Sequence, residues 1–213
     1  MPAARVERVI LASSGAAYGE QAERPVKETV SLRPASPYAV SKMAAEGYTQ
    51  ALGKLYGIET VILRIFNVYG PGQAIPPSHP PVIPKLLKQA LSGGSLVIYG
   101  QGTQTRDFIY ISDVVEALAA ASLPPEANGL VANVGSGGEV SINPLVDLIE
   151  EVIGRRREQS SRVHRLYSNA ESGGVSRLVA DITLAQQRLG FQPKVDLRQG
   201  LRLLLAEDKQ FAS

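Results

Sequence analysis

The 213-residue sequence contains no cysteine. This absence excludes disulfides, thiolate metal sites and cysteine nucleophiles, and it is typical of proteins from a reducing compartment. Long apolar runs are absent as well, because none approaches the length that a membrane-spanning helix needs. The first residues, MPAARVERV, lack the apolar core of a secretory signal. We therefore expect a cytoplasmic protein that does not associate with membranes.

Charge of one sign is not in excess either, since the sequence has 22 Lys and Arg and 20 Asp and Glu. The one dense cluster, Arg155–Arg157, follows a predicted helix, where it complements the negative end of the helix dipole and meets solvent. We therefore expect no nucleic-acid partner. His79 and His164 stand alone without a cluster of carboxylates, so we expect no metal site.

Strand-like and helical patterns alternate along the chain. The strand candidates are Val6–Ser13, Thr60–Phe66, Leu96–Tyr99, Leu130–Val134 and Val163–Tyr167. The helix candidates are Tyr38–Tyr56, Ile83–Leu91, Asp113–Ala121, Asn143–Ile153, Leu184–Leu189 and Leu197–Asp208. Because the strands are apolar without alternation and helices separate them, we expect an α/β fold built on a parallel sheet.

Two short segments carry side chains suited to chemistry. SSGAAYG follows the first predicted strand and offers Ser14, and SPYAVSK places Tyr38 and Lys42 on one face at the start of a helix. A free tyrosine, with a pKa of about 10, is a weak base at neutral pH. A nearby ammonium and the helix N-terminus favour its phenolate, which can then take a proton from a substrate hydroxyl that Ser14 orients. The Tyr/Lys spacing alone also occurs on solvated helix faces without a function.

Six motifs occur in the order seen in extended short-chain dehydrogenases/reductases: ASSGAAYG, SPYAVSK, LRIFNVYGPGQ, YGQGTQTRDFIYISDV, NVGSG and ADITLAQQRLGFQP. The sequence resembles the NAD-dependent epimerase/dehydratase family, and within it enzymes similar to UDP-glucose 4-epimerase. The resemblance implies an incomplete Rossmann-like parallel sheet with a smaller C-terminal substrate-binding lobe. Residues 1–75 would be the C-terminal part of an NAD-binding domain. Residues 76–213 would mainly form the nucleotide-sugar lobe, with about 108–135 returning to the sheet.

The resemblance also implies roles for individual residues. Ser14, Tyr38 and Lys42 match the catalytic triad of the family. The same three residues, together with Phe66, match positions that contact NAD, with Lys42 on the nicotinamide ribose and Phe66 at the nicotinamide end. The implied cofactor is therefore NAD.

Three further residues match positions that hold the substrate in this family. Asn67 and Arg106 match residues on the diphosphate of a nucleotide sugar, and Tyr99 matches a position that packs on uracil. A planar guanidinium suits phosphate oxygens, which agrees with the implied role of Arg106. The alternatives are a local ion pair between Arg106 and Asp107 and core packing for Tyr99. The implied partner is a UDP-sugar.

The residues after Ser14 favour one reaction of the family. Members that dehydrate or decarboxylate nucleotide sugars commonly carry acidic residues there, whereas this chain has Gly15 and Ala16. The resemblance therefore implies epimerisation at the sugar C4, in which Tyr38 takes the hydroxyl proton while NAD takes a hydride and returns it to the other face. A nucleotide-sugar dehydratase or reductase, and a non-catalytic nucleotide-sugar-binding fragment, are the alternatives.

Two departures from the family pattern carry expectations of their own. Glu171 stands where the family often has a diphosphate-binding arginine, so either Arg177 or Arg165 substitutes for it or the substrate is not a usual UDP-hexose. No G-x-G-x-x-G or G-x-x-G-x-x-G turn for the NAD pyrophosphate occurs in the chain. The sequence therefore resembles the C-terminal two-thirds of an epimerase, and we expect the isolated chain to be inactive.

The missing βα units would also affect packing and assembly. We expect the strands Val9–Ser13 and Thr60–Phe66 to lose neighbours and leave an unpaired sheet edge. Family members commonly dimerise through the Tyr/Lys helix and the helix before it. The resemblance thus implies a homodimer for a full-length form, but a regular dimer is not expected of a chain without that preceding helix.

Overall fold

The computed structural model describes residues 6–78, 80–154, 164–169 and 175–211. Its helices are α1 (Pro37–Tyr56), α2 (Val82–Leu91), α3 (Ile111–Ser122), α4 (Ile142–Gly154), α5 (Thr183–Leu189) and α6 (Leu197–Glu207), with 3₁₀ turns η1 (Gly15–Tyr18) and η2 (Pro125–Ala127). Its strands are β1 (Arg8–Ser14), β2 (Glu59–Ile65), β3 (Asn67–Tyr69), β4 (Leu96–Tyr99), β5 (Thr105–Arg106), β6 (Phe108–Tyr110), β7 (Val131–Val134), β8 (Val140–Ser141), β9 (Arg165–Ser168) and β10 (Arg177–Leu178).

Each predicted helix and strand has a counterpart, with ends that agree to within two residues. The strands that the sequence did not predict are β3, β5, β6, β8 and β10, which have two or three residues each. Such segments are too short to display a period in the sequence. Arg155–Arg157, His79 and Glu171 lie outside the described residues.

A three-stranded parallel sheet in the order β1-β2-β7 forms the first part of the molecule. The register places Ser14 beside Ile65, and Ile65 beside Val134, so the carboxyl ends of all three strands meet at one edge. The parallel α/β class is therefore confirmed. The expectation that Thr60–Phe66 would lose a neighbouring strand is wrong, because β2 is central and has a strand on each side. In the described part of the chain, β1 pairs with β2 alone.

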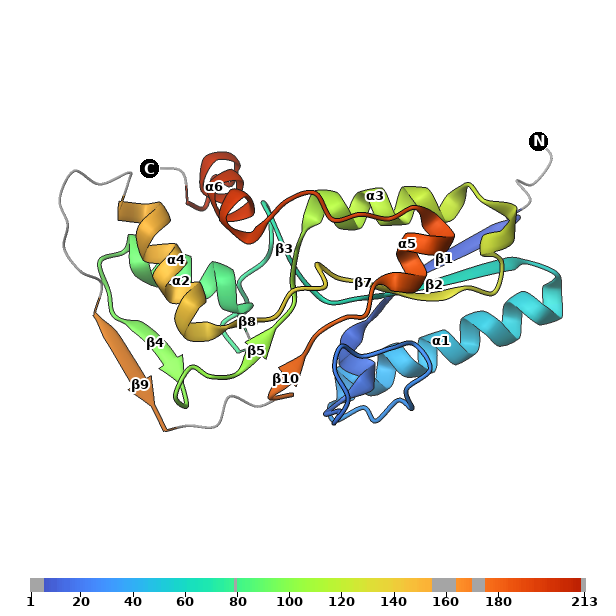
Figure 1. Cartoon of the computed structure of the whole chain (residues 1–213), viewed down its shortest axis with the longest axis horizontal. Helices are drawn as coiled ribbons and strands as arrows, with labels where there is room; N and C mark the ends of the chain where they lie inside the picture. Colours follow the sequence, from blue (N-terminus) through green and yellow to red (C-terminus); the bar gives the residue numbers. More distant parts are fainter. Residues whose placement is uncertain (1–5, 79, 155–163, 170–174, 212–213) are drawn as a thin grey trace.

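Helices cover both faces of this sheet (Figure 1): α1 lies on one face, and α3 and α5 lie on the other. Apolar side chains from β2 and β7 form a core with α3 and α5. Helix α1 is attached differently, since the residues it buries are Ala39, Glu46 and Gly53, seven apart. At Gly53 the helix approaches β2 closely, because an added Cβ would lie 2.3 Å from Cγ2 of Thr60.

The start of α1 follows from its sequence. Ser36 has extended backbone angles, and its Oγ accepts a hydrogen bond from the amide of Ala39 at 3.2 Å. Pro37 occupies the first helical position, where its missing N–H costs nothing. The helix ends at Gly57 in the left-handed conformation, with φ 65°. These caps place Tyr38 in the first helical turn.

The second part of the molecule packs around its own core (Figure 1). Helices α2, α4 and α6 bury apolar side chains against Leu96, Phe108 and Tyr110. Strand β4 pairs in parallel with β9, and β5 lies between β10 and β8. The short pair β3 and β6 leads from the first part to the second, with Asn67 beside Phe108 in its register.

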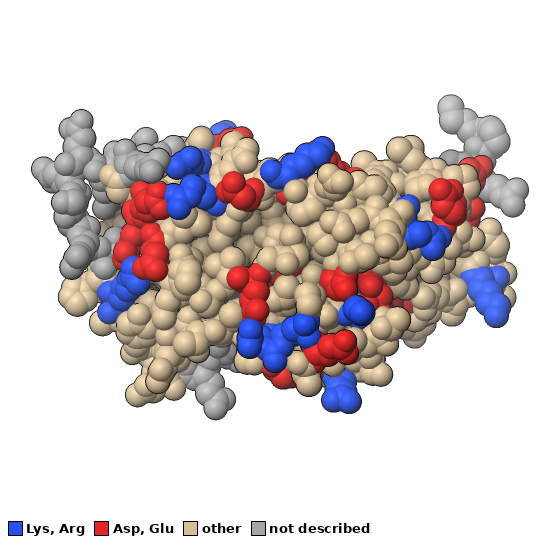
Figure 2. Space-filling view, viewed as in Figure 1, with Lys and Arg blue, Asp and Glu red and all other residues tan. Residues whose placement is uncertain are grey.

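Acidic and basic side chains are intermixed on the surface. Figure 2 shows Lys and Arg beside Asp and Glu in small groups across the viewed face, without a patch of one sign. None of the helices in the described residues is long and apolar enough to cross a membrane.

Candidate active site

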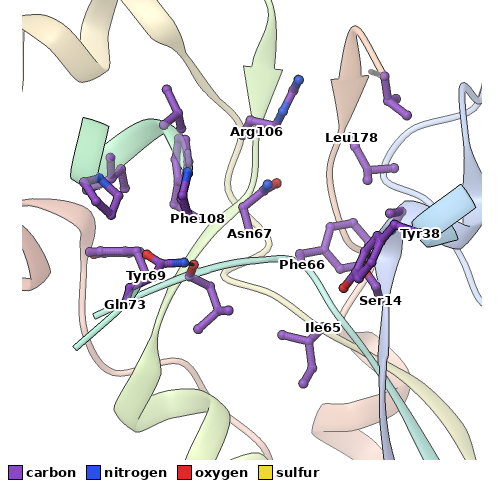
Figure 3. Close-up of a pocket in the computed structure, with 17 residues that line it drawn as sticks. Ser14, Tyr38, Ile65, Phe66, Asn67, Tyr69, Gln73, Arg106, Phe108 and Leu178 are labelled. Atoms are coloured by element: carbon purple, nitrogen blue, oxygen red, sulfur yellow. Dashed lines mark hydrogen bonds between the residues drawn. The ribbon is translucent and has the colours of Figure 1, made fainter. Parts of the chain in front are cut away.

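A cavity of about 340 Å³ opens where the carboxyl edge of the sheet meets the second part of the molecule. It is lined by Ser14, Ala16, Tyr38, Ile65, Phe66, Asn67, Val68, Tyr69, Gln73, Pro81, Val82, Ile83, Pro84, Arg106, Phe108, Val175 and Leu178. Figure 3 shows Ser14, Tyr38 and Phe66 together at one end, with Gln73, Tyr69 and Phe108 at the other. Asn67 and Arg106 lie between the two ends. Of the seven residues predicted for the site, the cavity brings five together.

Ser14 and Tyr38 come from elements that the fold fixes independently. Ser14 ends β1, and its Oγ accepts a hydrogen bond from the amide of Ala16 at 3.2 Å, which caps η1. Tyr38 belongs to the first turn of α1 and is 56% exposed, so its phenol is open to a ligand. The absence of a side chain at Gly15 leaves room for Phe66, because a Cβ there would lie 3.0 Å from the ring.

Lys42 lies beside the cavity but is not part of its lining. Its Nζ donates a hydrogen bond to the carbonyl oxygen of Ala12 at 2.9 Å and lies 5.8 Å from the centre of the Tyr38 ring. The predicted Tyr/Lys pair therefore shares one side of α1 and faces the end of β1. Their chemical roles stay predictions.

Asn67 and Arg106 are brought together by strand pairing. The backbone N–H of Asn67 donates to the carbonyl oxygen of Asp107 at 3.0 Å, so its side-chain amide is not used in this contact. Arg106 Nη1 donates to the carbonyl oxygens of Thr105 at 2.7 Å and Ser176 at 3.3 Å. Burial lowers the pKa of the Arg106 guanidinium, although the nearby Glu20 carboxylate opposes this shift. Among the described lining residues, Arg106 is the only Lys or Arg.

The alternative of a local ion pair between Arg106 and Asp107 is not what the structure shows. The Asp107 carboxylate is fully buried and accepts hydrogen bonds from the amides of Ser136, Gly137 and Ala180 at 2.7 to 3.1 Å. The hydroxyl of Ser136 donates a fourth at 2.6 Å. The GSGG segment after β7 therefore binds a carboxylate of its own chain, which leaves the Arg106 guanidinium to the cavity.

Tyr99 lies outside the lining of the cavity. Its ring is 38% exposed, and Nζ of Lys85 lies 4.1 Å from the ring centre. Core packing therefore does not explain Tyr99, and contact with a nucleobase stays a prediction.

The structure bears on the arginines named as substitutes at the Glu171 position. Arg165 forms ion pairs with Asp147 and Glu150, and Arg177 forms one with Glu139 at 2.8 Å. Neither residue lines the cavity. In the described part of the chain, both guanidinium groups are thus held by carboxylates away from the cavity.

Sequence reasoning missed Asp107 as an anchor and Glu46 and Arg64 as a buried pair. A signal was present for the last two. Glu46 stands midway between the small residues Ala39 and Gly53 on the buried side of α1. Arg64 interrupts an apolar strand, and a charge buried there requires a partner.

Comparison with known proteins places this architecture. Residues 1–135 match the sequence model of the NAD dependent epimerase/dehydratase family. This chain belongs to that family. The family resemblance of the six motifs is thereby confirmed.

Two curated relatives and one solved structure show how similar this chain is to other members of the family. A putative UDP-glucose 4-epimerase of Methanocaldococcus jannaschii is 39% identical over 199 residues, covering 92% of this chain and 61% of the relative. A UDP-glucose 4-epimerase of Mycolicibacterium smegmatis is 35% identical over 199 residues, covering 93% and 61%. The structure of a UDP-glucuronic acid 4-epimerase from Bacillus cereus with UDP-glucuronic acid and NAD is 32% identical with a TM-score of 0.86, covering 98% and 63%.

The chain spans about three fifths of the length of the curated relatives it matches. Proteins named as decarboxylases of UDP-glucuronic acid match as well. Together with the parallel sheet, the likeness to the solved epimerases confirms the predicted Rossmann-like class. The family and its solved members support NAD as the cofactor of the family.

Proposed function

We propose that this chain carries the nucleotide-sugar site and the catalytic side chains of an NAD-dependent 4-epimerase acting on a UDP-sugar such as UDP-glucose or UDP-galactose. One observation supports this most directly. A single cavity places the hydroxyls of Ser14 and Tyr38 at one end and the Asn67 amide and Arg106 guanidinium beyond them. A sugar hydroxyl and a diphosphate on the same molecule fit that arrangement.

At the sugar end, Tyr38 is the proposed base. Its phenol stands in the first turn of α1, where the helix dipole is positive, and the ammonium of Lys42 lies beside the ring. In the proposed reaction, the Tyr38 oxygen takes the proton of a sugar hydroxyl. The Ser14 hydroxyl, which already accepts one backbone amide, keeps its own proton to donate to that sugar oxygen.

For the diphosphate, Arg106 in the middle of the cavity is the proposed anchor. Its guanidinium is charged at any physiological pH, and its carbonyl partners neutralise none of that charge. Burial makes the site poor in water, so a phosphate oxygen there gains a strong charge-assisted hydrogen bond. The side-chain amide of Asn67 adds a neutral hydrogen-bond donor. Tyr99 is proposed to contact the uracil.

The cavity also favours epimerisation over elimination. The family resemblance implies that members which dehydrate or decarboxylate nucleotide sugars commonly carry acidic residues beside the catalytic hydroxyl. No Asp or Glu occurs among the described residues that line the cavity, and Gly15 and Ala16 follow Ser14. The remaining titratable groups suit proton transfer at one hydroxyl. A nucleotide-sugar dehydratase or reductase of the same family, or a non-catalytic nucleotide-sugar-binding fragment, is the second candidate.

The residues present fit one end of NAD. Ser14, Tyr38 and Phe66 gather at the carboxyl edge of the parallel sheet, and Lys42 lies next to them, which suits a nicotinamide riboside. When bound, NAD would supply the reversible oxidation of the sugar carbon. The 213 residues contain no glycine-rich turn of the pyrophosphate-binding spacing. We therefore propose that these residues alone bind NAD weakly and do not turn over a UDP-sugar.

A division into two lobes goes with this function. We propose that residues 1–75 and about 108–135 form the cofactor side, and that the rest mainly forms the nucleotide-sugar side. The cavity lies where residues of both sides meet, with Ser14 and Tyr38 from one and Val82 and Leu178 from the other.

Calorimetric titration with UDP-glucose tests the proposal. We expect binding to the unaltered chain, and a loss of about ten- to a hundredfold in affinity for Arg106→Ala, since a hydrogen bond to a charged group is worth about 1.5–3 kcal/mol. Arg177→Ala is the matched control, because Arg177 is held by Glu139 outside the cavity. No binding, or equal losses for both variants, would refute the proposed diphosphate site.

A further inference from the structure

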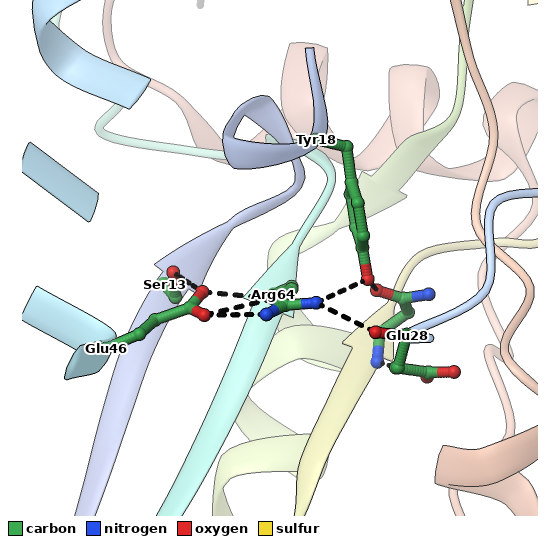
Figure 4. A network of polar contacts seen from close by, with 6 residues as sticks. Ser13, Tyr18, Glu28, Glu46 and Arg64 are labelled. Atoms are coloured by element: carbon green, nitrogen blue, oxygen red, sulfur yellow. Dashed lines mark hydrogen bonds and ion pairs between the residues drawn. The ribbon is translucent and has the colours of Figure 1, made fainter. Parts of the chain in front are cut away.

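A network of buried polar side chains joins α1 to the sheet (Figure 4), and one of its members is Ser13, the residue before Ser14. Its centre is Arg64 on β2. Arg64 Nη2 lies 2.7 Å from Oε2 of Glu46 on α1, and Nε lies 3.1 and 3.2 Å from the two carboxylate oxygens. Arg64 Nη1 donates to the hydroxyl of Tyr18 at 3.0 Å. The charges of the pair balance, and both side chains are more than nine-tenths buried.

The network extends to three further elements. Ser13 Oγ on β1 donates to Oε1 of Glu46 at 2.5 Å. The hydroxyl of Tyr18, which ends η1, donates to Oδ1 of Asn133 on β7 at 2.7 Å. The backbone N–H of Asn133 donates to Oε1 of Glu28 at 2.8 Å. One set of contacts therefore ties α1 to every strand of the sheet.

Its contacts enclose Ser14 on both sides along the chain. Ser13, immediately before it, is bound by Glu46, and Tyr18, four residues after it, is bound by Arg64. The turn between them has little freedom, because the backbone N–H of Ala16 donates a hydrogen bond to Ser14 Oγ and Gly15 packs against Phe66. The position of the Ser14 hydroxyl thus depends on Glu46 and Arg64, which do not line the cavity.

The same contacts fix α1. Tyr38, Lys42 and Glu46 follow each other at four-residue steps, so they lie on successive turns. Lys42 binds the carbonyl oxygen of Ala12, and Glu46 binds the side chain of Ser13. The helix is attached to β1 at two neighbouring points, and Tyr38 is one turn N-terminal to the attachment at Lys42.

We infer that Glu46 and Arg64 are positioning residues, which hold Ser14 and Tyr38 in one mutual geometry. The roles of Ser14 and Tyr38 rest on the proposed function. Apolar packing resists separation of a helix and a sheet but permits sliding, whereas a bidentate charge-assisted contact also fixes direction. The narrow buried stripe of α1 supplies little apolar packing, so direction at this interface comes from the ion pair.

The chain contains a matched control for this pair. Arg8 on β1 and Glu59 on β2 form an ion pair at the opposite end of these strands from Ser14, with 2.5 Å between Arg8 Nη2 and Glu59 Oε2. The Glu59 side chain is 41% exposed and far along the strands from Ser14. Loss of this pair is expected to change strand ends without reaching the cavity.

Amide hydrogen exchange followed by NMR tests the inference. The reporters are the amides of Ala16 and Ala39, which bond to the hydroxyls of Ser14 and Ser36, and the reference is Ile149 in the separate core of α4. We expect Glu46→Gln to raise the exchange rates of both reporters at least about tenfold relative to Ile149 and to shift both resonances. Glu59→Gln should leave these ratios unchanged.

A folded Glu46→Gln variant with unchanged ratios and resonances would overturn the inference, since a purely stabilising pair would change only the global opening rate. If Glu46→Gln does not fold, Ser13→Ala decides, because it removes one link to β1 and leaves the ion pair intact. An unchanged Ala16 ratio in that variant would also overturn the inference. No ligand or turnover enters these measurements, so failure of the proposed function would leave them interpretable.

Discussion

Arg64 on β2 and Glu46 on α1 form an ion pair with 2.7 Å between Nη2 and Oε2, and their side chains are 8% and 6% exposed. Two charges of opposite sign are thus removed from water at the interface between the helix that carries Tyr38 and the strand that leads to Phe66. Their removal from water is costly, so each charge depends on the other and on the surrounding hydrogen bonds.

The first prediction concerns this pair and stability. Glu46→Ala leaves the Arg64 charge buried without its carboxylate, so we expect the free energy of unfolding to fall by about 3–5 kcal/mol. Glu59→Ala removes a partly exposed partner of Arg8 and should cost less than about 1 kcal/mol. Urea unfolding of both variants measures the difference. Equal losses would contradict the account of the pair.

A second prediction compares two glycines of α1. At Gly53 a Cβ would lie 2.3 Å from Thr60 Cγ2 and 2.8 Å from the carbonyl oxygen of Ile58, so Gly53→Ala should lower stability by about 1–3 kcal/mol. At Gly47 nothing lies within 4 Å, so Gly47→Ala should raise stability by about 0.5–1 kcal/mol. Thermal unfolding gives the sign of each change. A stabilised Gly53→Ala variant would show that α1 does not approach β2 this closely.

The third prediction concerns the proposed base. Tyr38→Phe keeps the ring and removes the phenol, so UDP affinity should stay within about twofold. In a longer chain that also supplies a pyrophosphate-binding turn, NAD-dependent conversion of a UDP-sugar should slow by about 10²–10⁴-fold. Tyr48→Phe is the control, since Tyr48 lies on the same helix and is 72% exposed. Conversion that persists in Tyr38→Phe would exclude Tyr38 as the base.

The fourth prediction concerns acid stability near the cavity. Burial tends to raise the pKa of Glu20, but hydrogen bonds from the hydroxyl and amide of Ser176, with the charges of Arg24 and Arg106, outweigh it and hold the pKa below 4.5. A depressed carboxyl pKa stabilises the fold above the ordinary value of 4.5, and this stabilisation is lost as the pH falls through the lower folded-state value.

We therefore expect the melting temperature of Glu20→Gln to decline less steeply than that of the unaltered chain as the pH falls below 4.5. Glu23→Gln, an exposed residue of the same loop, serves as the comparison and should leave the decline as it is. The result that contradicts this account is an identical acid profile for Glu20→Gln and the unaltered chain.

Local sequence signals predicted the longer elements correctly. The serine-proline start of α1 and the glycines that follow α1 and α5 are caps whose chemistry acts within a few residues. The apolar runs of β1, β2 and β7 predicted a parallel sheet, because strands buried on both faces do not alternate.

What the sequence did not predict depends on contacts between distant residues. The pairing of β3 with β6 brings Asn67 to Asp107, and nothing within either segment specifies the other. Asp107 looked like a partner of Arg106, but four donors from distant loops bind its carboxylate. Tyr99 was placed by family likeness at the nucleotide, and the cavity lining does not reach it.

Parallel calorimetric titrations of the 213-residue chain with UDP and with NAD test the central claim most directly. The account predicts that UDP binds to Asn67 and Arg106 in the middle of the cavity and that NAD binds far more weakly. Tight NAD binding without UDP binding would contradict it, because the cavity would then serve a dinucleotide rather than a nucleotide sugar.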